Sequence, residues 1–201
     1  MTDRFQRFLT AIDAQDDDAT EALALTLRAQ DEPALIALLN KDGDEDGDPE
    51  RYWWAVRALA LCGGPDAVPA LAAALEDEDE TVRAAAAMAL ARVHERHPAA
   101  VAPTLDRVAR LLDDDNGAVR QVATDSLARC GDDAIHVLAA VLAGDRQGAR
   151  TRAMAALRKI ATFPAAKLMF QYLNDDNYLV HTYAHEGLDE MGLLENVLLL
   201  P

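Results

Sequence analysis

Apolar side chains recur along this chain with the period of an α-helix, and this pattern occurs in five copies. If the first residue of each copy is position 0, the apolar positions fall at 0, 3, 4, 7, 8 and 11, as between Val82 and Val93. Such positions share one face of a helix. The copies align without gaps and begin at Arg51, Val82, Val119, Ala149 and Val180. The pattern therefore predicts five equivalent amphipathic helices.

Polar and turn-forming residues separate these helices in the same way each time. An acidic stretch precedes every copy, and its Asp and Asn residues can cap the coming helix and match the positive end of its dipole. Glycine or proline follows every copy and ends the helix. A second helix then begins, for example over residues 67–75 and 134–142. The repeating unit is therefore a helix pair.

The two ends of the chain fit the same scheme less regularly. A degenerate first unit spans 16–39, with Leu23, Leu35 and Leu39 in core positions. Before it, residues 2–14 are expected to form a capping helix. Its inward side chains are predicted to be Phe5, Leu9 and Ile12.

The acidic turn, the Val-Arg step, the Ala-rich stretch, the Ala-Leu step and the glycine turn together resemble HEAT repeats. They are closest to the short type found in phycobilin-lyase-like proteins, and the resemblance covers about residues 16–192. It implies an all-α fold, a right-handed α-α superhelix of about six helix pairs. The expected parts are a capping helix at 1–15, units near 16–46, 47–78, 79–115, 116–145, 146–176 and 177–201, and a capping half-repeat at 193–201.

The resemblance also assigns a role to the second residue of each copy. In the family this residue is an arginine that belongs to a ladder of polar contacts between neighbouring repeats. Tyr52 and His181 replace it in the first and last copies. The ladder is therefore expected only across Arg83, Arg120 and Arg150.

The resemblance places the five motif helices on the concave face, where positions 2, 5 and 9 would point away from the core. In the second and third repeats these positions are apolar, with Met88 beside them. They are Trp53, Val56, Ala60, Ala84, Ala87 and Ala91. One interpretation is an apolar groove that receives a partner helix or peptide; the other is that alanine serves as a common surface helix former.

The leading hypothesis is a non-enzymatic adaptor whose concave face binds another protein, with the chain itself a monomer or weak homo-oligomer. The expected contact residues are Trp53, Arg57, Met88, Met154, Arg158 and His185. The enzymatic alternative is a lyase-like or regulatory subunit related to the proteins that attach bilins. Few free aromatic residues and no evident reactive cysteine speak against it.

Composition narrows the choice of partner. The net charge is −16, from 24 Asp and 11 Glu against 16 Arg and 3 Lys. So acidic a surface repels phosphate backbones, which disfavours nucleic acid and with it the HEAT-like glycosylases. Excess Asp with little Lys is typical of a salt-rich cytoplasm, as in halophilic archaea, although a GC-rich genome also favours Ala, Asp and Arg. No signal peptide or transmembrane stretch is evident, so a cytoplasmic protein without membrane contact is expected.

Four features of the sequence could indicate another kind of site or surface. Asp42, Asp44, Asp46 and Gly47 match the first half of a calcium loop, but position 12 of such a loop would be Trp53, so a solvated loop is preferred. His181 and His185 have the spacing of a metal pair but no third ligand. Cys62 and Cys130 occupy the same core position two repeats apart and are expected to be buried and unpaired.

The fourth feature is the apolar end, 193–201, which packs back as a lid or docks on another chain; the lid is preferred. No catalytic residues, cofactor or metal are predicted.

Overall fold

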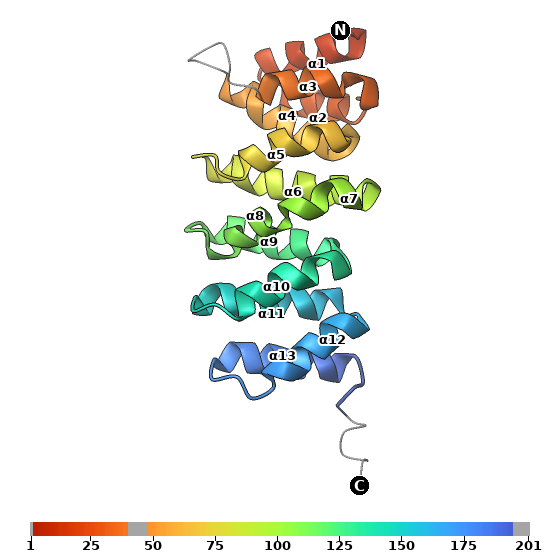
Figure 1. Cartoon of the computed structure of the whole chain (residues 1–201). Helices are drawn as coiled ribbons and strands as arrows, with labels where there is room; N and C mark the ends of the chain where they lie inside the picture. The colour runs from red at the N-terminus through yellow and green to blue at the C-terminus, as the bar shows by residue number, and fades with distance from the viewer. Residues whose placement is uncertain (1, 40–47, 195–201) are drawn as a thin grey trace. The chain divides into compact units, whose positions relative to one another are not determined.

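The computed structural model describes residues 2–39 and 48–194, and every regular element in these ranges is a helix (Figure 1). The α-helices are α1 (Asp3–Asp13), α2 (Asp17–Ala24), α3 (Glu32–Leu39), α4 (Pro49–Cys62), α5 (Val68–Ala74), α6 (Glu80–Arg96), α7 (Pro98–Val101), α8 (Leu105–Arg110), α9 (Gly117–Arg129), α10 (Ile135–Leu142), α11 (Gln147–Ile160), α12 (Phe163–Met169) and α13 (Tyr178–Glu190). Short 3₁₀ turns precede or follow several of them. The predicted all-helical repeat fold is confirmed.

The chain divides into two compact units, residues 1–103 and 104–201, here called unit 1 and unit 2. The boundary falls inside the predicted repeat 79–115. There the second helix of the repeat is interrupted by a 3₁₀ turn, Ala102–Thr104, which separates α7 from α8. Pro103 lies in this turn, and because proline has no backbone N–H, it cannot donate the hydrogen bond that would continue the α-helix there.

The motif helices α4, α6, α9, α11 and α13 begin where the sequence predicts, and four of them carry the expected N-cap. The side chains of Asp48, Asp79, Asn116 and Asn177 accept hydrogen bonds from backbone N–H groups in the first turns of α4, α6, α9 and α13. Each bond satisfies a donor that the helix itself leaves unpaired. The acidic stretches are therefore structural as well as solubilising.

The exception is α11, whose N-cap residue is Arg146 and which has no side-chain cap. The acidic residue of this stretch, Asp145, precedes the capping position by one. Arg146 has extended backbone angles that suit a capping residue, and its ion pair with Asp113 is largely exposed and so worth little.

We expect the substitution Arg146→Asn to raise the free energy of unfolding by about 1 kcal/mol, because asparagine can accept a backbone N–H bond there. Chemical denaturation followed by circular dichroism measures the change. Arg146→Ala is the matched control, since it removes the same arginine without adding an acceptor. An equal gain in both variants would show that removal of the arginine, not capping, is responsible.

The core is built from the repeated apolar positions. Position 8 is a leucine in all five copies, and each of these side chains has no exposed surface. They are Leu59, Leu90, Leu127, Leu157 and Leu188. Because one helix pair is too small to bury its own apolar face, these leucines depend on neighbouring pairs for their burial.

In unit 1, α4 and α6 lie side by side, α3 packs on α4, and α5 packs on α6 (Figure 1). Helix α1 packs on α2 and α4 and caps this end of the unit, as predicted. Phe5 and Ile12 are buried as expected, but Phe8 is fully buried and Leu9 is only half-buried. The predicted inward role of Leu9 belongs to Phe8, because the buried stripe of α1 also includes Ala11, and its centre therefore lies nearer Phe8 than Leu9.

Unit 2 has two layers. Helices α9, α11 and α13 form one layer of motif helices, and α8, α10 and α12 form the other. The packing of α13 on its neighbours is close at Gly187, where an added Cβ would lie 2.7 Å from Sδ of Met169. Glycine at this place allows the helices to approach each other.

Candidate functional site

The exposed residues of the motif helices lie in a row at positions 2, 6 and 10. In unit 1 this row faces away from the core over two neighbouring helices, and we call it the ridge. It consists of Trp53, Arg57 and Leu61 on α4 and Ala84, Met88 and Arg92 on α6. All six side chains are exposed or half-buried. The ridge is the candidate binding surface of unit 1.

Positions 5 and 9, which the sequence analysis places on the solvent side, are buried in unit 1. Val56, Ala60, Ala87 and Ala91 are all almost completely inaccessible. The reason is that α4 packs along α6 as well as on α3, so the buried arc of a motif helix is wider than one helix pair requires. The predicted groove floored by these four residues is therefore wrong.

Arg57 is held in place by three contacts. Its guanidinium carbon lies 4.7 Å from the ring centre of Trp53 and 5.2 Å from that of Trp54. Its Nη2 lies 2.7 Å from a carboxylate oxygen of Glu21 on α2. A guanidinium stacked on aromatic faces and paired with a carboxylate is fixed and locally neutralised. Because its charge is already paired, Arg57 contributes an ordered surface to the ridge and little unpaired positive charge.

Two side chains on the ridge are both large and apolar. Leu61 is 46% exposed and Met88 is 40% exposed. Met88 belongs to the contact residues predicted from the sequence, whereas Leu61 was not predicted. Leu61 occupies position 10, outside the apolar positions of the repeat, and a leucine out of register on an amphipathic helix is the signal that could have identified it. The two residues form the exposed apolar part of the ridge.

The remaining predicted contact residues belong to unit 2, and one of them is unavailable. Met154 is fully buried at position 5 of α11, so the prediction that it contacts a partner is wrong for the same packing reason as above. Arg158 forms ion pairs with Glu186 and Glu190 of α13, which fix α11 to α13. Because Arg158 is already paired with these two glutamates, its charge is not free to bind a partner.

His185 is exposed on α13, where it stacks edge-on against His181 with ring centres 5.9 Å apart. His181 in turn stacks on Tyr178 at 5.5 Å. The pair is thus part of an aromatic row on one helix. Among the described residues, no three His, Cys, Asp or Glu side chains are placed to hold a metal ion.

At positions 2, 6 and 10, unit 2 is polar where unit 1 is partly apolar. The residues are Gln121, Asp125 and Arg129 on α9, Thr151, Ala155 and Lys159 on α11, and Thr182, Glu186 and Glu190 on α13. Lys159 on α11 pairs with Asp125 on α9, and Glu186 and Glu190 on α13 pair with Arg158 on α11. This face is therefore satisfied by its own contacts.

The arginine ladder is present in altered form. Arg150 binds Asp175, which lies in the acidic stretch before the next motif helix, and this is a contact between repeats. Arg83 donates to the carbonyl oxygens of Asp77 and Glu78, in the stretch before its own helix. Burial, and next the charge of Asp77, raise the pKa of Tyr52, so tyrosine holds the ladder position beside a carboxylate.

Arg120 donates to the carbonyl oxygens of Asp114 and Asp115, yet its Nε is buried with no hydrogen-bond partner among the described residues. The position equivalent to Asp175 in the next repeat is Gly144. Burial, and next the positive charge of Arg120, lower the pKa of Arg152. The ladder therefore lacks one carboxylate in unit 2.

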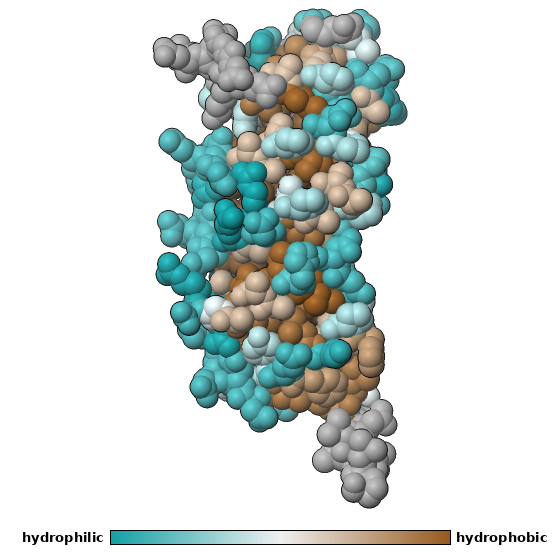
Figure 2. Space-filling view, in the orientation of Figure 1, coloured by the Kyte–Doolittle hydropathy of each residue, from teal (hydrophilic) through white to brown (hydrophobic). Residues whose placement is uncertain are grey.

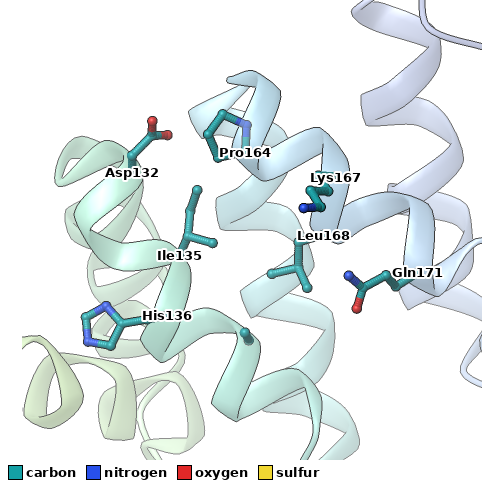
Figure 3. Close-up of a pocket in the computed structure, with 8 residues that line it drawn as sticks. Asp132, Ile135, His136, Pro164, Lys167, Leu168 and Gln171 are labelled. Atoms are coloured by element: carbon teal, nitrogen blue, oxygen red, sulfur yellow. The ribbon is translucent and has the colours of Figure 1, made fainter.

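A pocket of about 430 Å³ lies between α10 and α12 in unit 2 (Figure 3). Leu168 projects from α12 toward Ile135 on α10, and Pro164 lies above them (Figure 3). The polar residues around it include Asp132, whose carboxylate accepts a hydrogen bond from Thr162. The pocket is open and its lining is mainly apolar. It is therefore suited to hold an apolar side chain and not a charged group.

Both cysteines are free, Cys130 buried and Cys62 half-buried. Burial, and next the negative charges of Asp31 and Glu32, raise the pKa of the Cys62 thiol to about 11. The thiol also lies 3.5 Å from the carbonyl oxygen of Ala58. Cys62 is therefore a protonated thiol at neutral pH and a poor nucleophile.

We expect iodoacetamide to alkylate Cys62 slowly at pH 8, because only about a thousandth of this thiol is ionised there, against about a quarter of an ordinary cysteine. The rate should rise about tenfold for each pH unit up to pH 10. Mass spectrometry of the Cys130→Ala variant, with glutathione as reference, measures it. Labelling of Cys62 as fast as glutathione at pH 8 would contradict the raised pKa.

Two predicted features lie outside the described residues. The candidate calcium loop, Asp42 to Gly47, is one, and most of the apolar half-repeat 193–201 is the other. Within the described ranges no helix is long and apolar enough to cross a membrane.

Comparison with known proteins places this geometry in a group of folds. Residues 32–109 match the family model of HEAT repeats. These residues include α3 to α6 and therefore the whole ridge. No curated protein matches the chain.

The whole chain is similar in structure to other repeat proteins. An archaeal HEAT-like repeats protein from Thermococcus onnurineus has a TM-score of 0.59 at 14% identity, over 95% of this chain and 81% of that one. A designed armadillo repeat protein in complex with the peptide (KR)4 has a TM-score of 0.51 at 17% identity, over 94% and 100%. At these identities the likeness establishes the fold.

The complex of CpcE and CpcF of phycocyanin lyase from a Nostoc species is more distant. Its TM-score is 0.39 at 22% identity, over 94% of this chain and 88% of that one. That likeness is too low to support the bilin-lyase alternative.

Proposed function

We propose that this HEAT-repeat protein is a non-enzymatic scaffold that binds a segment of another protein on the ridge of unit 1. The observation that carries the proposal is the exposure of Leu61 and Met88 on neighbouring helices. Covering two such side chains is favourable, since each square ångström of apolar surface removed from water contributes about 25 cal/mol. Arg57 on the same ridge is already held by Glu21 and Trp53, so little order must be gained there on binding.

Similarity of fold supports a peptide or a helix as the bound segment. Stacked helix pairs offer a long surface built from equivalent positions, which suits a partner that is itself extended or helical. The designed armadillo repeat protein, which shares this fold, is in complex with a peptide. The proposed contact residues are Trp53, Arg57, Leu61 and Met88. The predicted contact residues of unit 2, Met154, Arg158 and His185, are not among them.

We further propose that the protein acts in a salt-rich cytoplasm as a monomer or weak homo-oligomer. The excess of Asp over Lys supports this location, since carboxylates keep a surface hydrated when salt is high. The two free cysteines are compatible with a reducing compartment.

Affinity purification from the native cytoplasm at high potassium chloride tests the scaffold function. The variant Leu61→Asp/Met88→Asp is expected to lose the proteins that the unchanged chain recovers, because charges would be placed in the exposed apolar part of the ridge. Both side chains are exposed, so the fold should tolerate the change.

The control is Leu25→Asp, which alters a more exposed leucine outside the ridge. It should recover the same proteins as the unchanged chain. If the ridge variant also recovers them in full, the ridge is not the binding surface and the proposal fails.

A further inference from the structure

The two units differ sharply in charge. Residues 1–103 contain 21 acidic and 9 basic side chains, whereas residues 104–201 contain 14 and 10. Unit 1, which carries the ridge, therefore holds −12 of the net charge of −16. An approaching cationic group is attracted to unit 1 much more strongly than to unit 2.

Seven acidic residues of unit 1 lie at one end of the ridge. Asp48 and Glu50 begin α4, and the run Glu76–Glu80 ends at the first residue of α6. We call these residues the acidic edge. Figure 2 shows hydrophilic side chains gathered where the loops before the motif helices lie in each unit. Hydrogen bonds from Thr81, and first that from its side chain, lower the pKa of Asp79, so this carboxylate is ionised at neutral pH.

The arginines of the ridge do not cancel this field locally. Arg57 is paired with Glu21, and Arg92 lies 3.8 Å from a carboxylate oxygen of Glu95. Each is therefore matched by an acid of its own. Arg51 pairs with Asp48, and Arg83 binds the carbonyl oxygens of Asp77 and Glu78, but the seven acids of the acidic edge outnumber these two arginines, so it keeps an excess of negative charge. A partner meets the exposed apolar part of the ridge at Leu61 and Met88, and carboxylates at the end where α4 and α6 begin.

The spacing of the two features defines the partner. Eight residues separate Glu80 from Met88, which is about 12 Å along a helix. Eleven residues separate Glu50 from Leu61, or about 16 Å. About four or five extended residues span such a distance. A suitable ligand has cationic side chains at one end and apolar side chains about 12 to 16 Å from them.

We propose that the segment bound by the ridge is basic and amphipathic, with Lys or Arg on the acidic edge and apolar side chains on Leu61 and Met88. This inference rests on the proposed scaffold function and adds the chemistry of its partner. Opposite charges on the two surfaces raise the rate of encounter and make binding sensitive to salt.

The test uses fluorescence anisotropy with two synthetic peptides of about 12 residues, one with lysines at one end and leucines at the other, and one with glutamates in place of the lysines. The lysine peptide should bind the full chain, at least about tenfold more weakly in 1 M than in 0.1 M potassium chloride. The glutamate peptide should not bind. Circular dichroism at each salt concentration checks that the chain remains folded.

Two charge variants locate the effect. Glu78→Lys/Glu80→Lys should weaken binding of the lysine peptide at least about tenfold. Asp145→Lys/Asp176→Lys makes the same change in net charge on exposed loops of unit 2 and should leave the Kd within about twofold. Equal weakening by both variants would overturn the proposal, since the acidic edge would then have no special role.

Other results would also overturn the inference. Binding of the glutamate peptide as tight as that of the lysine peptide excludes a basic partner. Self-association in sedimentation that is lost with Leu61→Asp/Met88→Asp would assign the ridge to a second copy of this chain. If the native partner is lost with that ridge variant but not with Glu78→Lys/Glu80→Lys, the scaffold function stands and the basic chemistry fails. If neither variant affects capture, both fail.

Discussion

Replacement of Leu127 by alanine is expected to lower the free energy of unfolding by about 2–5 kcal/mol. Leu127 lies on α9 in unit 2, has no exposed surface, and holds the position at which every motif helix has a buried leucine. Its removal costs the transfer free energy of the lost methyl groups and leaves a cavity between helices of neighbouring repeats. The loss should be large because each repeat depends on its neighbours for a core.

Chemical denaturation followed by circular dichroism measures this effect. Leu25→Ala is the matched control, because Leu25 is 60% exposed and its truncation should change stability by less than about 0.5 kcal/mol. If Leu127→Ala also cost less than about 0.5 kcal/mol, the position would not be the tightly packed core that the repeat requires.

Replacement of Asp31 by alanine is the second substitution with a large expected effect, a loss of about 2–4 kcal/mol. Asp31 is 2% exposed, and its carboxylate accepts hydrogen bonds from the hydroxyl of Thr2 and the backbone N–H of Arg28. An oxygen of the same carboxylate lies 3.4 Å from Nε of Arg4. Alanine would leave these donors without their acceptor in a buried place, which is the costly case for a polar network.

Asp31→Asn separates hydrogen bonding from charge. Asparagine keeps the size and one acceptor oxygen, so it should retain part of the stability that alanine loses. Asp66→Ala, at an exposed aspartate, should have little effect. A loss in Asp31→Ala no greater than in Asp66→Ala would mean that the carboxylate does not anchor α1 to the first repeat.

The sequence was most informative where the structure repeats. Leu59, Leu90 and Leu127 can be aligned by eye, and a residue that returns at the same helical position in every copy has the same environment in every copy. The caps at Asp79 and Asn116 were predictable for a similar reason, since a hydrogen bond to the first turn of a helix involves only residues close in sequence.

Prediction of the candidate site was less complete. Met88 and Arg57 were identified as exposed, but Met154 was placed on the surface and Leu61 was missed. The buried arc of a motif helix depends on how many helices pack around it, and that number is a property of the stack and not of one amphipathic segment. The pairing of Arg158 also depends on the stack, because both glutamates that pair with it lie on the next motif helix.

The sequence by itself determined the helix pairs, their core leucines and the acidic stretches before the motif helices, because each of these follows from local periodicity, capping or composition. Only the tertiary structure decided which side chains remain exposed on the ridge, which arginines are already paired, and that the chain divides near Pro103 into two compact units. Those features depend on contacts between residues about 30 positions apart, such as Arg57 with Glu21 and Arg158 with Glu190. Helical periodicity reports only on neighbours within a few turns, so it cannot reveal them.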